Sequence, residues 1–126
     1  MVIAIASIGG EISPHFGHSD GCMIYSLANQ ELTVNEFVNN PLARIKQGLF
    51  RQNHGKDNCS CRFFAEFLLH EIQFDVLVTG HIGDAASQLL SRRGVEVIAN
   101  TKGNISDYLR EYISKKGLTC PAFALS

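Results

Sequence analysis

The sequence carries almost no net charge, which excludes one broad class of function. Its 126 residues include 11 basic and 12 acidic side chains, so the formal net charge is -1. Proteins that bind nucleic acids or anionic membranes through surface charge need an excess of Lys and Arg. We therefore expect neither nucleic acid nor membrane as a partner.

The sequence also lacks the motifs of common nucleotide-binding and hydrolytic enzymes. It contains no G-x-x-x-x-G-K-[ST] loop, no G-x-G-x-x-G after the first apolar run and no G-x-S-x-G elbow. The first apolar run, residues 2–8, holds no carboxylate to serve a two-metal nuclease. We expect a protein that is not an enzyme. A hydrolase that uses a Cys-His pair stays formally open, because no pattern fixes which Cys would pair with which His.

Cysteines are few, and no apolar run is long enough to cross a bilayer. The starting run MVIAIASI lacks the basic region and the small-residue cleavage site of a signal peptide, so we expect a cytoplasmic protein. In a reducing compartment, four cysteines favour metal ligation, catalysis or burial over disulfide formation.

The residues that are present follow the pattern of a small α/β domain. A chain of 126 residues with 45% hydrophobic residues suffices for one core. β-favouring runs cover residues 2–8, 22–27, 32–38, 74–80 and 95–99, and helical spacing of apolar side chains covers segments from about Ser60, from 84 to 94 and from Ile105. The second and third runs, joined at Asn29 and Gln30, predict an antiparallel hairpin. The later β-α-β order requires parallel pairing, so we expect a mixed sheet with helices packed on it.

The last helix has the clearest ends. Apolar residues recur from Ile105 at i, i+3, i+4, i+7 and i+8. Asn104 precedes this run and is expected to cap the helix. Arg92-Arg93-Gly94 and Lys115-Lys116-Gly117 place cations at the negative ends of the last two helix dipoles, with a glycine where a left-handed residue is needed.

Two loops are expected at the carboxyl edge of the parallel strands, where α/β sheets bind ligands. The first, ISPHFGHSDGC, contains His15, His18 and Cys22, and imidazole and thiolate are common ligands of zinc, copper and iron. The second, TGHIGDA, places His81 between Gly80 and Gly83, whose amides could form an anion-binding turn at a helix start. The same residues also fit a purely structural role, in which the histidines are exposed in loops, the cysteine is buried in a strand and the glycines permit a tight turn.

The segment HGKDNCSC, residues 54–61, stands directly before the first long helix. Cys59 and Cys61 fall at its amino end, where the helix dipole favours a thiolate. With His54 they would form an exposed soft site for iron-sulfur, copper or zinc species. A C-x-C pair is less specific than two C-x-x-C pairs, and cysteine often acts as a small hydrophobic residue, so ligation, redox chemistry and packing all stay open.

Several segments together resemble the dinitrogenase iron-molybdenum cofactor biosynthesis family over nearly the whole chain. They are, in order, ISPHFGHSDGCMIYSL, NNPLA, HGKDNCSC, VLVTGHIGDAASQLLSRRGVEVI and the closing helix. The resemblance implies a ribonuclease-H-like fold, with three antiparallel strands followed by parallel ones in a five-stranded mixed sheet flanked by three helices. It also implies carriage of iron-sulfur or molybdenum-containing clusters during nitrogenase cofactor assembly.

The family motifs match this sequence residue by residue in three places. They match at His15, Phe16 and Gly17, at Gly80, Ile82 and Gly83, and at the histidine- and cysteine-containing loop of His54, Cys59 and Cys61. His18 departs from the pattern because many relatives have arginine there. The second thiol of CSC is also not a general family feature.

We therefore expect residues 1–126 to form one domain that carries an iron-sulfur or iron-molybdenum-type cluster for nitrogen fixation between donor and acceptor proteins. The long connection before the first helix would close over the cargo, and a homodimer could complete the ligand set. The expected metal ligands are Cys59, Cys61, His54, His18 and Cys22, and the expected cluster-binding residues are Gly80, Gly83, His15 and His81. The alternatives are a zinc-binding or thiol-redox regulatory module, a Cys-His enzyme, and a protein-binding domain without metal.

Overall fold

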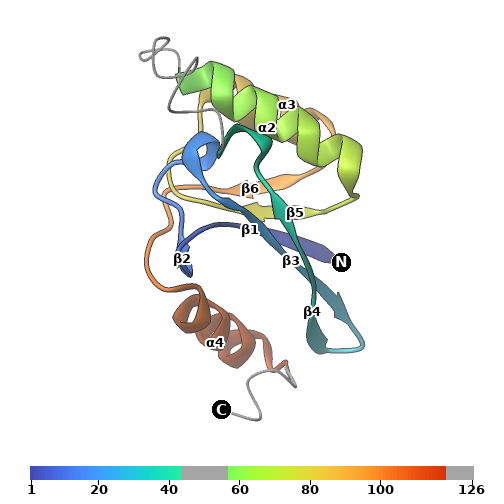
Figure 1. Ribbon diagram of the computed structural model, residues 1–126. Helices are drawn as coiled ribbons and strands as arrows, with labels where there is room; N and C mark the ends of the chain where they lie inside the picture. The colour runs from blue at the N-terminus through green and yellow to red at the C-terminus, as the bar shows by residue number, and fades with distance from the viewer. Residues whose placement is uncertain (44–56, 119–126) are drawn as a thin grey trace.

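A computed structural model shows one mixed β-sheet with helices on both faces, and it describes residues 1–43 and 57–118 (Figure 1). The short helices η1 and η2 are 3-10 turns. In chain order the elements are β1 (Val2–Ile8), β2 (Glu11–Ile12), η1 (Phe16–His18), β3 (Gly21–Ala28), β4 (Glu31–Asn39), η2 (Pro41–Ala43), α2 (Asp57–Glu71), β5 (Val76–Val78), α3 (Asp84–Arg92), β6 (Glu96–Ile98) and α4 (Ile105–Lys116).

Strand β1 lies inside the sheet, whose order is β4-β3-β1-β5-β6. It pairs antiparallel with β3 and parallel with β5, while β3 and β4 form an antiparallel hairpin and β5 and β6 pair in parallel. The hairpin turns at Asn29 and Gln30, whose φ values of 54 and 63 are the positive values that a tight two-residue turn requires. The predicted mixed α/β architecture and the predicted hairpin are therefore confirmed.

The structure departs from the prediction mainly in short elements. The stretch after β1, predicted as loop, contains β2, which pairs with the end of β1 across Gly9 and Gly10. Both glycines have positive φ, 57 and 85, so the chain reverses there without steric cost. Strands β5 and β6 are shorter than the predicted runs, and α2 starts before Ser60. The predicted helical turn at Ile45 and Leu49 lies outside the described residues.

The two faces of the sheet are buried against different helices. Helices α2 and α3 cover one face, and α4 covers the other (Figure 1). Along β1, Ala4 and Ala6 belong to the first core, whereas Ile3 and Ile5 belong to the second. Alternate residues of a strand point to opposite faces, so a strand that is covered on both sides must be apolar throughout.

The described helices owe their positions to apolar faces. In α2, Phe64, Ala65 and Leu68 are buried, while Arg62 and Glu66 form an exposed ion pair of 3.0 Å on the outer face. Phe64 stacks on Phe16 of η1 with ring centres 4.9 Å apart, which fixes η1 against α2. No helix in the described parts of the chain is long and apolar enough to span a membrane.

Helix α4 has the predicted caps. The Asn104 side-chain oxygen accepts hydrogen bonds from the backbone N–H groups of Ser106, at 2.8 Å, and Asp107, at 3.3 Å. Gly117 ends the helix in the left-handed conformation with φ 65. These caps satisfy backbone groups that a helix cannot pair internally.

Replacing Asn104 tests how much this cap stabilises the protein. Asn104→Ala removes the acceptor, so we expect the free energy of unfolding in urea to fall by about 1 kcal/mol. Asn104→Asp keeps an acceptor oxygen and adds negative charge at the positive helix end, so its stability should stay within about 0.5 kcal/mol of the original. Equal losses in the two variants would show that the cap is not stabilising.

Candidate functional site

Two segments that are distant in the sequence run side by side beyond the carboxyl end of β5. The N–H of Gly80 donates to the carbonyl oxygen of Ser13 at 2.9 Å, and the N–H of His81 donates to that of Pro14 at 2.8 Å. In the other direction, the N–H of Phe16 donates to the carbonyl oxygen of His81 at 2.8 Å. His15 and His81 are thereby paired like residues of neighbouring parallel strands. The two loops that we predicted at this sheet edge therefore meet.

Gly80 makes this close approach possible. A Cβ atom at this position would lie 2.5 Å from the carbonyl oxygen of Pro14 and 2.6 Å from that of Ser13, so no side chain fits. The N–H of Gly80 already donates to Ser13. The predicted anion cradle at Gly80 stays a prediction, and an anion bound there would have to replace this hydrogen bond. The glycine allows the backbone of residue 80 to pack directly against that of Ser13 and Pro14.

Three imidazole rings gather at this edge. The rings of His15 and His18 stack with centres 4.3 Å apart, and the ring of His81 lies 5.2 Å from that of His15. His18 and His81 are exposed, and His15 is half-buried. The predicted proximity of these side chains is thus present in the structure.

Cys61 approaches the ring of His15 from α2. Its sulfur lies 4.0 Å from Nδ1 of His15 and accepts the N–H of Gly83 at 3.5 Å. Gly83 is the N-cap of α3, so the sulfur sits at the positive end of that helix rather than of its own. The N–H of Gly83 and the helix dipole behind it favour negative charge on the sulfur.

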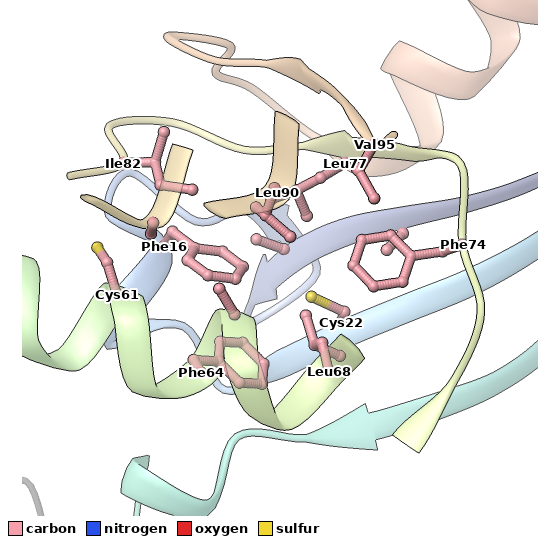
Figure 2. Packing of buried hydrophobic residues seen from close by; sticks show 14 of the residues in the cluster. Phe16, Cys22, Cys61, Phe64, Leu68, Phe74, Leu77, Ile82, Leu90 and Val95 are labelled. Carbon is pink, nitrogen blue, oxygen red and sulfur yellow. The ribbon is translucent and has the colours of Figure 1, made fainter. Parts of the chain in front are cut away.

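The burial of Cys61 corrects the predicted exposed thiol patch. The residue is 0% exposed, because the fifth residue of α2 falls on the face that packs against the sheet. Figure 2 shows its side chain at one end of the first core, beside Phe16 and Ile82. The amide of Gly83, which we predicted to bind an anion, is directed at this sulfur.

The glycine of the His-Phe-Gly motif brings η1 close to α2. A Cβ atom on Gly17 would collide with the hydroxyl of Ser60 and lie 2.9 Å from the backbone nitrogen of Cys61. Phe16, which is 0% exposed, anchors the turn in the core. The motif therefore sets the distance between His15 and the thiol.

Cys22 takes no part in this arrangement. It lies on β3, is fully buried, and its burial raises the pKa of the thiol far above the usual value. Figure 2 shows its sulfur near Leu68 and Phe74, away from Cys61. A neutral thiol among apolar side chains suits packing better than metal binding, and the ligand role of Cys22 stays a prediction.

The predicted pair of Cys59 and Cys61 does not share one helix face. The α-helix includes both positions, and residues two apart on an α-helix are rotated by about 200°. The predicted role of Cys59 as a metal ligand stays a prediction. His54, the third predicted ligand of this segment, lies outside the described residues.

The described donors do not form a closed ion cage. Among the side chains that the structure describes, which exclude those of residues 43–59, no three of His, Cys, Asp or Glu are arranged to hold a metal ion. The site offers one thiol and a row of imidazoles along an open edge. Soft and borderline metals fit this donor set, but a complete coordination shell requires further ligands or a rearrangement.

Sequence reasoning missed Asn40 as a positioning residue. This buried side chain donates to the carbonyl oxygens of Gly17, at 3.2 Å, and Ser19, at 2.9 Å, and accepts the N–H of Leu42 at 3.0 Å. It therefore ties η1 to the end of β4. The Asn-Pro dipeptide was the available signal, since such pairs start turns.

Comparison with solved structures supports the fold. A crystal structure of the protein PH0822 has a TM-score of 0.66 at 22% identity, covering 91% of this chain and 90% of that chain. The apo form of the orange protein from Desulfovibrio gigas also has a TM-score of 0.66, at 24% identity, with 91% of this chain and 88% of that chain covered. At these identities the similarity shows a shared fold. No curated protein matches the sequence.

The family comparison agrees with the resemblance drawn from the sequence. The match extends over residues 1–115, and thus includes the histidine edge, α2, α3 and most of α4. The chain belongs to the family described as dinitrogenase iron-molybdenum cofactor.

Proposed function

We propose that the protein binds a metal cluster of iron-sulfur or iron-molybdenum type as cargo and carries it without catalysing a reaction. The observation that supports this proposal is the meeting of Cys61 with His15, His18 and His81 at one edge of the sheet. Thiolate and imidazole suit iron-containing and copper-containing species. Membership of a family named for the iron-molybdenum cofactor links the chain to the same chemistry.

The exposure of the donors suggests an order of binding. His18 and His81 are exposed and would meet the cargo first, while Cys61 lies behind the half-buried His15. Opening of the first turn of α2 would admit Cys61, and with it Cys59 and His54, to the cargo. A site that is completed only on loading suits a carrier, because the cargo must also leave.

The order β4-β3-β1-β5-β6, with antiparallel strands followed by parallel ones, supports a ribonuclease-H-like topology. We further propose one domain over residues 1–126, a cytoplasmic location in which the thiols stay reduced, and a role in nitrogen fixation. Donor and acceptor proteins of cofactor assembly would be the partners, and a homodimer could add ligands.

Cluster uptake by two cysteine variants tests the ligand role of Cys61. Cys61→Ala and Cys22→Ala each remove a fully buried thiol, so they are matched for loss of packing. After anaerobic reconstitution with iron and sulfide, with and without molybdate, we expect Cys61→Ala to lower cluster affinity by about tenfold or more. Cys22→Ala should bind as the original protein does, as measured by bound metal and visible absorption.

Cluster binding by Cys61→Ala at the original affinity, in a protein whose circular dichroism is unchanged, would remove Cys61 from the site. Loss of binding in both variants together with loss of folding would be resolved with Cys61→Ser, which keeps the side-chain volume but not the soft donor.

An exposed histidine tests the imidazole edge without disturbing the core. His81→Ala should reduce cluster affinity by roughly tenfold and leave the melting temperature unchanged, because the side chain is at the surface. His70→Ala is the matched control, since His70 is exposed on α2 and its ring nitrogen lies 3.5 Å from the carboxylate of Glu71. Equal affinities of the two variants would contradict a role for His81.

A zinc-binding or thiol-redox module is the second candidate, and the contact of Cys61 with His15 favours it. A cysteine-imidazole pair at a positive helix end also suits zinc or a reactive thiolate. Elemental analysis of protein purified without oxygen separates the candidates. Iron with labile sulfide and visible colour supports the carrier, whereas stoichiometric zinc in colourless protein supports the second candidate.

A further inference from the structure

A pocket lies on the opposite face of the sheet from the histidine edge, between the strands and α4. Its volume is about 120 Å³. The lining side chains belong mainly to the second core, not to the core that holds Cys61. They are Met1, Ile3, Val76, Val78, Glu96, Ile98, Tyr108, Leu109, Tyr112 and Lys116. The pocket is therefore independent of the proposed cluster site.

The floor of the pocket is aliphatic and limits the size of a ligand. Ile3, Val76, Val78 and Ile98 come from three neighbouring parallel strands, and Leu109 faces them from α4. Apolar cavities of about 150 Å³ hold a benzene-sized molecule. The pocket here is somewhat smaller and fits a branched alkyl group of about four carbon atoms.

Charges of opposite sign stand at the same pocket. Lys116 places its Nζ 5.7 Å from the centre of the Tyr112 ring. The pKa of Tyr112 is raised mainly by burial and further by the negative charge of Glu96. The carboxylate of Glu96 and the ammonium group of Lys116 therefore both lie close to the Tyr112 side chain. The pKa of Tyr108 is also raised, chiefly by burial, so both hydroxyls stay protonated at neutral pH.

Neighbouring charges already have partners within the protein. Lys115 pairs with Glu111 at 2.9 Å, and the terminal amine of Met1 donates to the carbonyl oxygen of Leu27 at 2.9 Å. Among the side chains that the structure describes, those of residues 1–42 and 60–118, neither Glu96 nor Lys116 forms an ion pair. These two groups are therefore placed to recognise a ligand.

We propose that this pocket binds an α-amino acid with a branched alkyl side chain. The alkyl group would occupy the aliphatic floor, the ammonium group would face Glu96, and the carboxylate would face Lys116. A ligand with a single charge would leave one of these residues without a counter-charge. Charge-assisted hydrogen bonds at both ends of a zwitterion satisfy both.

Three probes with the same alkyl tail separate the contributions of charge and shape. Leucine carries both charges, 3-methylbutylamine carries only the ammonium, and 4-methylpentanoate carries only the carboxylate. In nuclear magnetic resonance titrations we expect leucine to bind about threefold to fivefold more tightly than either of the others. Resonances of Tyr108 and Tyr112 should shift, and those of His15 and His81 should not.

Two charge variants assign each end of the ligand. Glu96→Gln should weaken leucine binding about threefold to fivefold without weakening 4-methylpentanoate binding. Lys116→Gln should weaken leucine binding by a similar factor without weakening 3-methylbutylamine binding. Both residues are exposed, so the fold should persist. Glu66→Gln removes the same charge from an exposed position on α2 and should leave leucine binding unchanged.

Three results would overturn the proposal. Equal affinity for all three probes would show that the pocket binds them through apolar contacts alone. Tightest binding of the amine or the acid would show recognition of one charge only. Absence of binding by every probe to the folded protein would show that the pocket is not a ligand site, and none of these results bears on cluster binding.

Discussion

Three backbone hydrogen bonds between residues 13–16 and 80–81 hold the two histidine loops against each other, beyond the point where β5 ends. They continue the parallel pairing of the sheet into segments that would otherwise be independent loops. The contact needs Gly80, because a Cβ atom would overlap the carbonyl oxygens of Ser13 and Pro14. The positions of His15 and His81 follow from this backbone contact.

The thiol is brought to the imidazoles by the hydrophobic core. Phe16 and Phe64 stack across the interface of η1 and α2, and Gly17 lets the two elements approach closely. The amino end of α3 supplies an N–H group to the Cys61 sulfur from a third direction. A soft donor is thus held by elements whose packing also stabilises the fold, and a change in packing would alter the site.

The sequence predicted the long elements well, because their causes are local. The apolar run of β1 indicated a strand covered on both faces, and Asn104 marked the start of α4. The two-residue strand β2 was missed, since so short a run has no periodicity and its pairing depends on the turn at Gly9 and Gly10.

The site was predicted less completely, because its contacts join distant segments. No pattern tells which of Cys22 and Cys61 meets an imidazole, since strand face and helix phase decide it, and the contact of Cys61 with His15 spans 46 residues. From the sequence alone, a glycine at position 80 is equally consistent with an anion-binding turn and with a close contact between two backbones. Only the partner of its N–H distinguishes them.

The protein thus presents a donor-rich edge on one side and an aliphatic pocket with two charges on the other face. The central claim is that the thiol of Cys61 and the neighbouring imidazoles bind the metal together. X-ray absorption at the iron edge of the reconstituted protein tests this directly. The account predicts sulfur and imidazole nitrogen in the iron coordination shell. A shell without imidazole nitrogen, unchanged when Cys61 is replaced, would contradict it.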